Sequence, residues 1–352
     1  MRILVTYGRE RPYPPCGLHV VGALRAVGQQ AALLCVRDHP WWVKATKRMI
    51  PLRRLMPWDP VAWANDRLIQ AARCYRPDVI LDIGGEIFLR TTLQELRRCN
   101  GTRLAAWLVE GTKDLQLAGL LQEYDLLTST SRGAIRQLSQ TGVRHVQYLP
   151  FATEPRWFHP PTLVTAHRPF RVGFVGAYSA RRTQFLESVS DLGLQLWGTE
   201  WDGAPLGMLQ QHLRSGKGVF GRALVRCYQQ AVITLCIQRE HMISVDPSGQ
   251  PIGTGLSYRH FDVPACGSFL LTEWVEELPD ALTIGEEVDT FTTPGELREK
   301  VRFWLSHESA REAMPQRARA RVLHEHTYQQ RMRSWLQLVE RVAGRPSYVS
   351  PT

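Results

Sequence analysis

The stretch FRVGFVGAYSARRTQFLESVSDLGLQLWG, residues 170–198, decides the fold class of this chain. Its first apolar run is typical of a buried strand and ends at Gly176. Residues 182–193 have the spacing of an amphipathic helix that stops at a glycine, and LQLWG indicates a second strand. A strand, a glycine-containing turn, a helix and a second strand form the opening unit of an open parallel α/β sheet.

The same order of elements is predicted at the start of the chain. Residues 2–6 indicate a short buried strand, residues 18–28 an amphipathic helix and residues 31–36 a second strand. Strands and helices alternate in both halves, so the chain is predicted to be an α/β protein with two similarly built domains. Further strands and helices are predicted at residues 79–84, 91–99, 103–109, 115–124, 125–131, 132–142, 145–151, 223–231, 232–237, 258–267, 268–272, 294–307 and 310–342.

Residues 152–169 separate the two series of elements. They contain four prolines and show neither a helical nor a strand period, which is typical of an interdomain linker. In open parallel α/β sheets, ligands bind beyond the carboxyl ends of the strands. We therefore expect a ligand cleft between the two domains.

The charge balance points to an anionic partner. Of 352 residues, 43 are Lys or Arg and 33 are Asp or Glu, which gives a formal net charge of +10. This balance favours a nucleotide, a nucleic acid, a phosphorylated lipid or a membrane surface, although a soluble, arginine-rich protein without such a partner would share it. The seven cysteines are widely spaced without a C-x-x-C pair, which argues against a disulfide framework or zinc site and favours a reducing cytoplasm. No apolar run approaches the roughly 18 residues of a membrane-spanning helix.

Several motifs of known chemistry are absent from the sequence. Without D-x-D, a transferase that holds its sugar nucleotide through Mg²⁺ or Mn²⁺ is not expected. The sequence also lacks G-x-x-x-x-G-K-[ST], G-x-G-x-x-G after the first strand, and G-x-S-x-G. These absences argue against a P-loop ATPase, a dinucleotide enzyme and a nucleophile-elbow hydrolase.

Two segments have residue types that bind a diphosphate. After Gly176, the turn AYSARR places Arg181 and Arg182 at a helix start, where backbone N–H groups and guanidinium groups bind phosphate. In GTGLSYRHFDVPACG, residues 253–267, a glycine-rich loop runs into a helix. The alternatives are two surface arginines and an ordinary loop–helix junction. The candidate ligands in the second segment are Ser257, Tyr258, Arg259 and Asp262, the last of these for ribose hydroxyls.

A longer pattern extends around this second segment. Arg259, Phe261 and the run 264–267 are followed by LLTEWVEEL, GEEVDTFTTPGEL and the triplet His326-Thr327-Tyr328 before Arg331. The pattern also includes three earlier runs, LPFATEPRWFHP, FVGAYSARR and LWGTEW. In this combination the second half of the chain resembles the CgeB-type (spore maturation protein) glycosyltransferases, which are related to retaining group 1 GT-B enzymes. The first half resembles that family only in its layout and in AAWLVEG.

The resemblance implies a GT-B fold, with two Rossmann-like domains facing a central cleft and a C-terminal helix that crosses back to the first domain. The implied domains are an acceptor domain at residues 1–165, a donor domain at 166–325, and the returning helix and tail at 326–352. The implied activity is retaining, metal-independent sugar transfer from a nucleoside diphosphate sugar of the UDP, GDP or dTDP type, with no further cofactor.

The resemblance also assigns roles to single residues. Asp262 takes the place of the glutamate that holds ribose, and Gly176, Arg181 and Arg182 take that of the phosphate-side loop. Without a metal, arginines, backbone amides and a helix dipole must stabilise the charge on the departing diphosphate.

Two carboxylates are candidates for the catalytic base that accepts the acceptor's proton. Glu86 follows the predicted strand VILDIG, and Glu110 follows the predicted strand RLAAWLV. For each, the alternative is a helix-capping or salt-bridged carboxylate.

The segment WWVKATKRMIPLRRLMPW, residues 41–58, has five basic residues and no acidic one among Trp, Met, Ile and Leu. It suits an interfacial element on an anionic membrane, a nucleic-acid backbone with stacked bases, or an insertion that covers the first domain. The resemblance implies that the first domain binds the acceptor, so residues 41–58 are candidates for contacting it. The predicted location is the cytoplasm, either free or peripheral at the membrane.

Three other functions stay open on the sequence alone. The same fold could transfer sugar to a base hydroxyl in DNA. It could be a non-catalytic GT-B scaffold, because Asp262 is shorter than the family's glutamate and paired acids are missing. It could also be a sugar-nucleotide epimerase that acts on the donor without an acceptor.

Overall fold

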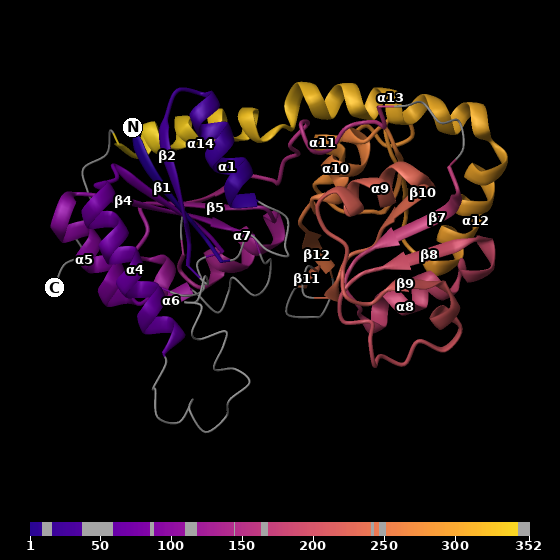
Figure 1. Ribbon diagram of the computed structural model, residues 1–352, viewed down its shortest axis with the longest axis horizontal. Coiled ribbons are helices and arrows are strands. Elements are labelled where there is room, and N and C mark those ends of the chain that lie inside the picture. The colour runs from indigo at the N-terminus through magenta and orange to yellow at the C-terminus, as the bar shows by residue number, and fades with distance from the viewer. Residues whose placement is uncertain are drawn as a thin grey trace. The chain divides into compact units, whose positions relative to one another are not determined.

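The computed structural model describes residues 1–8, 16–36, 59–84, 88–109, 118–143, 145–162, 168–240, 243–245 and 251–343. By their internal contacts these residues form two compact units, each with a parallel sheet between helices (Figure 1). The first unit comprises Met1–Ser129, Ile135–Leu149 and Met332–Thr352. The second comprises Thr130–Ala134 and Pro150–Arg331.

The sheet of the first unit has six parallel strands in the order β2-β1-β3-β4-β5-β6. Its central strands are mostly apolar because both faces of the sheet are covered by helices, and the polar Thr6 and Asp82 within them bond to each other at 2.8 Å. The strands are β1 (Arg2–Tyr7), β2 (Gln30–Cys35), β3 (Val79–Ile83), β4 (Arg103–Leu108), β5 (Leu126–Ser129) and β6 (Val146–Tyr148).

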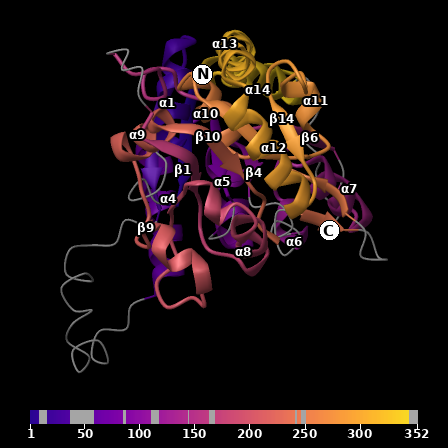
Figure 2. The ribbon, with the colours of Figure 1, turned by 90° about the vertical axis from the view of Figure 1, so that its right-hand side faces the viewer.

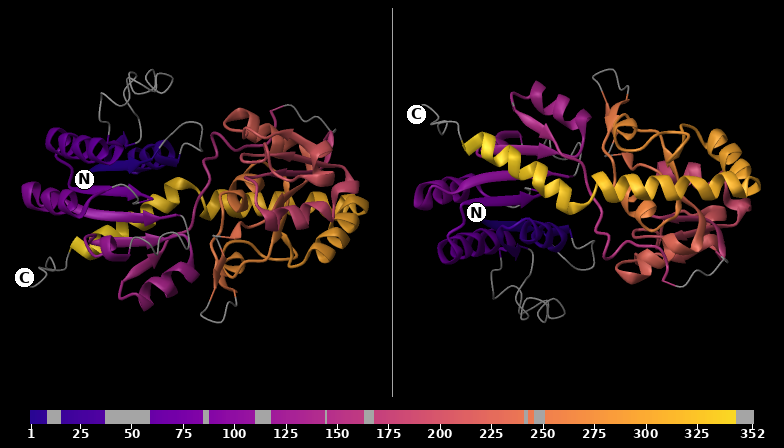
Figure 3. Two further views of the ribbon diagram at one scale, coloured as in Figure 1. Left: turned by 90° about the horizontal axis from the view of Figure 1, so that it is seen from below. Right: turned by 90° about the horizontal axis from the view of Figure 1, so that it is seen from above.

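Helices cover both faces of this sheet. On one face, apolar side chains of four helices join the strands in a single core cluster, with Leu68 and Leu93 almost fully buried. On the other face lie α1 and the C-terminal helix α14 (Tyr328–Ala343), which runs along the sheet in both views of Figure 3. The remaining bounds are α1 (Cys16–Ala26), α4 (Pro60–Tyr75), α5 (Arg90–Asn100), α6 (Ala118–Leu121) and α7 (Arg132–Gln140).

The sheet of the second unit also has six parallel strands, in the order β14-β13-β10-β7-β8-β9. A separate antiparallel hairpin, β11–β12, precedes helix α10 in the chain. The strands are β7 (Phe170–Val175), β8 (Leu194–Trp197), β9 (Leu213–Ser215), β10 (Ala231–Cys236), β11 (Ile243–Val245), β12 (Pro251–Thr254), β13 (Phe269–Glu273) and β14 (Asp289–Phe291).

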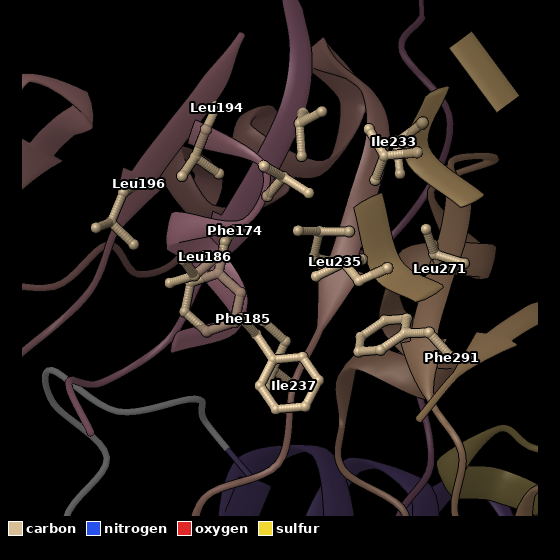
Figure 4. Packing of buried hydrophobic residues seen from close by; sticks show 14 of the residues in the cluster. Phe174, Phe185, Leu186, Leu194, Leu196, Ile233, Leu235, Ile237, Leu271 and Phe291 are labelled. Carbon is tan, nitrogen blue, oxygen red and sulfur yellow. The ribbon is translucent and has the colours of Figure 1, made fainter. Parts of the chain in front are cut away.

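The core of the second unit lies between its sheet and three helices, α8, α12 and α13. Phe185 of α8 packs near Phe291 of β14, and Phe174 and Leu235 from the central strands are fully buried (Figure 4). Helices α9 and α10 lie on the opposite face, and Figure 2 shows α13 at the top and α8 at the bottom of the unit. The helices are α8 (Ala180–Glu187), α9 (Arg222–Gln230), α10 (Arg259–Ala265), α11 (Leu278–Ala281), α12 (Pro294–Ser306) and α13 (Glu308–Glu325). Short 3-10 turns span Ser190–Leu192 and Gly207–His212.

The predicted α/β class with parallel sheets is confirmed. Two local predictions were wrong, and one helix was missed. The continuous terminal helix over 310–342 is two helices, α13 and α14, the glycine-rich loop at 253 begins inside β12, and helix α4 was not predicted. The signal for α4 is Asp59-Pro60, because the Asp59 carboxylate accepts the Val61 N–H at 2.8 Å and proline suits the first helical position.

A capping box separates the two terminal helices. The Thr327 hydroxyl oxygen accepts the Gln330 N–H at 3.4 Å, and the Gln330 side-chain oxygen accepts the Thr327 N–H at 2.8 Å. This exchange satisfies backbone groups at the start of α14. Thr327 also forms an isolated bridge with Thr153, which draws the backbone out of the helical path.

His326, at the same junction, should make the protein acid-sensitive. Its Nε2 donates to the Ala281 carbonyl at 3.1 Å, and its Nδ1 lies 3.2 Å from an Arg331 nitrogen that donates to it. Burial, and then the Arg331 charge, lower the pKa of His326 to about 4. The unfolded chain binds this proton near pH 6.5 and the native chain only near pH 4. Stability should therefore fall by about 3 kcal/mol as the pH drops between those values.

The measurement is the melting temperature of the wild type and of His326→Gln between pH 4.5 and 7.5. The variant cannot take up this proton, so we expect its melting temperature to fall less steeply on acidification. Equal slopes for the two proteins would show that His326 does not carry the effect.

Candidate active site

The candidate site lies where the strand order of the second sheet reverses. From β7 the chain runs outward through β8 and β9, and β10 then pairs with β7 on its other side. Ligands of open α/β sheets bind beyond the carboxyl ends of the strands at such a point. The predicted diphosphate ligands Gly176 and Arg181 follow the end of β7, so the topology brings the first predicted segment to this position.

Two glycines allow the backbone to approach closely at the end of β7 and β8. A Cβ atom on Gly198 would lie 1.6 Å from the Gly176 carbonyl oxygen, which also accepts the Trp201 indole N–H at 2.7 Å. A Cβ on Gly176 would lie 3.0 Å from a terminal nitrogen of Arg259 and 2.8 Å from the Phe174 ring. The missing side chain of Gly176 thus leaves room for a guanidinium group beside the strand end, and that of Gly198 leaves room for the Gly176 carbonyl.

Arg259 is held at one end and open at the other. Its Nε donates to the Val175 carbonyl at 2.7 Å, and its guanidinium carbon lies 5.9 Å from the centre of the Phe174 ring. Its two terminal nitrogens donate to no residue in the part of the chain that the structure describes. The side chain is half-buried at the first position of α10. This arrangement suits a bidentate bond to phosphate oxygens.

Arg182 has a different environment. It is 3% exposed, and all three of its guanidinium nitrogens donate to the carbonyls of Ile237 and Ala177, at 2.7–3.0 Å. Burial, and then the nearby Arg259 charge, lower its pKa well below the usual value. Arg182 therefore contributes positive charge and ties α8 to the end of β10, but its nitrogens are already engaged with carbonyls.

Arg181 forms a two-point ion pair with Glu273. One terminal nitrogen lies 2.9 Å from a Glu273 oxygen, and the other contacts the second oxygen. Glu273 also accepts the Gln238 N–H at 2.9 Å and is 8% exposed. The diphosphate contact predicted for Arg181 would have to compete with this pair.

A buried polar cluster shapes the loop before α10. The Ser257 N–H donates to His260 Nδ1 at 2.9 Å, and His260 Nε2 lies 2.9 Å from the Thr272 hydroxyl. The Ser257 hydroxyl is 3.4 Å from the Cys236 sulfur. Burial raises the pKa of Cys236, but His260, Arg259 and the Ser257 hydroxyl outweigh it and lower the pKa to about 6. The cluster joins the loop to β10 and β13 and so fixes the start of the helix that carries Arg259.

Asp262 and Tyr258 are both engaged within the second unit. The Asp262 carboxylate accepts the Thr153 hydroxyl at 2.8 Å, and its burial raises its pKa well above the usual value. The Tyr258 ring lies over Phe151, with centroids 3.8 Å apart. Asp262 is 5% exposed and Thr153 engages one of its two carboxylate oxygens, so the ribose contact stays a prediction.

Three predicted features lie outside the described residues, namely Glu86, Glu110 and the segment 41–58. No group of three or more His, Cys, Asp or Glu side chains among the described residues is placed to hold a metal ion. None of the helices in that same part of the chain is long and apolar enough to cross a membrane.

Two acidic residues lie beside the arginines, Glu273 and Glu240, and neither was predicted as a site residue. Glu240 accepts the Arg181 N–H at 3.0 Å, and Glu273 pairs with the Arg181 side chain. Glu240 follows the predicted strand 232–237, and Glu273 follows the predicted strand 268–272. The signal was available, because the carboxyl ends of neighbouring parallel strands meet at one sheet edge.

Known proteins resemble this chain in part of its sequence and in its fold. Residues 181–337 match the family described as "Glycosyl transferase-like". No curated protein sequence matches the chain. Several solved structures share its fold at low sequence identity. A sucrose-phosphate synthase from Thermosynechococcus elongatus has a TM-score of 0.68 and 11% identity over 97% of this chain and 99% of its own.

Two further structures are similar over the whole length. A glycosyltransferase from Rickettsia africae has a TM-score of 0.67 and 11% identity over 98% of this chain and 99% of its own. HepE from Anabaena, in complex with UDP and glucose, has a TM-score of 0.65 and 11% identity over 97% of this chain and 100% of its own. Residues 181–337 thus match a glycosyltransferase-like family, and the chain has the GT-B fold with two Rossmann-like domains.

Proposed function

We propose that the chain transfers a sugar from a nucleoside diphosphate sugar to an acceptor, and that its second unit binds the donor. The observation that carries the proposal is Arg259, which is anchored to the end of β7 while its terminal nitrogens have no partner among the described residues. A guanidinium group held in this way is ready to bind phosphate oxygens. The similar structure of HepE is described with UDP-glucose, which makes a uridine nucleotide the first donor to test.

The proposed chemistry needs positive charge at the departing diphosphate. The bond between the sugar carbon and the phosphate oxygen breaks, its electron pair stays on the diphosphate, and the acceptor oxygen forms the new bond to the sugar carbon. Arg259 and the buried charge of Arg182 would stabilise the departing group without a metal ion. The acceptor's proton would pass to Glu86, to Glu110 or to the departing phosphate itself. Retention of configuration is part of this proposal, as is the narrower likeness to CgeB-type enzymes.

We propose that the first unit binds the acceptor. The basic and aromatic residues of segment 41–58 suit an acceptor on an anionic membrane surface or a nucleic acid. We propose a cytoplasmic location, because the cysteines that the structure describes are free thiols. The free cysteines are Cys16, Cys35, Cys74, Cys227, Cys236 and Cys266.

Thermal unfolding in the presence of nucleotides tests the donor assignment. UDP, GDP, dTDP and CDP are each added at increasing concentration, with uridine and inorganic phosphate as controls. A nucleotide present at about 100 times its Kd stabilises the native state by about 2.7 kcal/mol, so the melting temperature should rise by several degrees. If none of the four diphosphates shifts the melting temperature more than the controls do, the donor assignment is wrong.

A further inference from the structure

Glu240 holds the position that a donor phosphate would be expected to approach. It lies just beyond the end of β10, and its Oε1 accepts the Arg181 N–H at 3.0 Å. That amide is among the first of α8, where unpaired N–H groups attract anions. The Glu240 side chain is exposed, so a ligand can reach it.

Arg182 lies close enough to Glu240 for its charge to act on this carboxylate. The charges of Arg259, Arg239 and Glu240 all act on Arg182, the buried centre of the cluster. The terminal nitrogens of Arg259 have no partner among the described residues, and the buried Nε of Arg239 has none there either. Glu273 and Glu200 pair with Arg181 and Arg239, so within the described residues Arg259 is the arginine of this cluster whose terminal nitrogens stay open to an anion. Glu240 is a third carboxylate in the cluster.

Glu240 is ionised at neutral pH. Burial raises its pKa, but hydrogen bonds from its own backbone, from the Arg181 amide and from the Ser179 hydroxyl outweigh burial and lower it. A ligand phosphate at the start of α8 would meet a fixed negative charge as well as the arginines.

We infer that Glu240 sets the balance between donor and product at this subsite, by repelling the released nucleoside diphosphate more than the nucleotide sugar. The inference rests on the proposed function. In a nucleotide sugar both phosphates are esterified and carry one charge each. After transfer, the terminal phosphate gains a second ionisation with a pKa of about 6, so the product carries nearly one further negative charge at pH 7.5.

The extra charge gives Glu240 a selective effect. For a charge separation of a few ångströms in a solvated site, the added repulsion should weaken product binding by about fivefold relative to the donor. Glu240 would thereby limit product inhibition, because the product leaves more readily than the donor. It is a specificity-determining residue in this assignment and takes no part in bond breaking.

The test is isothermal titration calorimetry with UDP and with UDP-glucose at pH 7.5, on the wild type and Glu240→Gln. Glutamine keeps an oxygen that can accept the Arg181 N–H but removes the charge. We expect the Kd for UDP to fall about fivefold more than the Kd for UDP-glucose. Glu187→Gln, at the other end of the same helix, is the matched control and should leave both Kd values unchanged.

The outcomes separate the inference from the proposed function. If the wild type binds neither UDP nor UDP-glucose, the proposed function fails for uridine nucleotides and the inference fails with it. If the wild type binds both, and Glu240→Gln binds UDP no more tightly or gains equally for both ligands, only the inference is overturned. A weaker affinity for UDP-glucose in Glu240→Gln would instead make Glu240 a donor ligand.

Discussion

Replacing Arg259 by alanine should lower the rate of UDP-glucose turnover by about 100- to 1,000-fold while the protein stays folded. Arg259 is the arginine of the cluster whose terminal nitrogens are open within the described part of the chain. Its loss would leave Arg182 and Arg181 in place, but their nitrogens are bonded to carbonyls and to Glu273. The charge that develops on the departing diphosphate would then lack its nearest free donor. Turnover is measured as UDP release in the presence and absence of acceptor extracts.

Two further variants define what Arg259 contributes. Arg259→Lys keeps the charge but loses the planar fork, so it should recover only part of the lost rate. Arg222→Ala, at an exposed position at the start of α9, removes a charge of the same kind away from the cluster and should behave as wild type. Turnover by Arg259→Ala at the wild-type rate would remove the main support for the donor site.

The layout of the fold was predictable because it depends on local patterns. Buried strands such as β7 and β10 are short apolar runs, and the helices between them repeat every three to four residues. The switch point then follows from strand order, which places the turn after Gly176 at the ligand-binding edge. The phosphate-binding residue types in the turn after Gly176 and in residues 253–267 are also local features, so the sequence alone indicated them.

The availability of each predicted ligand could not be predicted from local patterns. Whether Arg181 is open to a ligand depends on Glu273, which is 92 residues away in the sequence. Asp262 is engaged by Thr153, 109 residues away, and that partner lies in a segment predicted only as a linker. Pairings of this kind are set by the assembled fold. Residue type and spacing therefore predicted the same phosphate-binding role for Arg181, Arg182 and Arg259, whereas the structure shows that their bonding partners differ.

The structure shows how part of the net charge of +10 is distributed around the candidate site. At the switch point, Arg181 is neutralised by Glu273 and Arg239 by Glu200, at 2.9 Å. Arg259 has no such carboxylate among the described residues. The site therefore presents a focused positive charge in a cluster that is otherwise largely compensated, which favours one phosphate-bearing ligand over a broad anionic surface.

Replacing Gly198 by alanine should damage both stability and donor binding. The new Cβ would lie 1.6 Å from the Gly176 carbonyl oxygen and 2.6 Å from the Trp201 indole nitrogen, and neither can simply rotate away. One is backbone, and the other belongs to a fully buried ring that donates to the same carbonyl at 2.7 Å. The ends of β7 and β8 must move apart, at a cost on the order of 3 kcal/mol or more.

The measurements are chemical denaturation and the Kd for UDP on the same protein samples. Because Gly176 borders the Arg259 guanidinium, we expect UDP affinity to fall even in the fraction of Gly198→Ala that stays folded. Gly295→Ala is the matched control. That glycine lies in the first turn of α12 with only the Thr293 hydroxyl near its added Cβ, at 4.0 Å, so alanine should be neutral or slightly stabilising. Wild-type stability and UDP affinity in Gly198→Ala would show that the two strand ends are not packed as closely as the site requires.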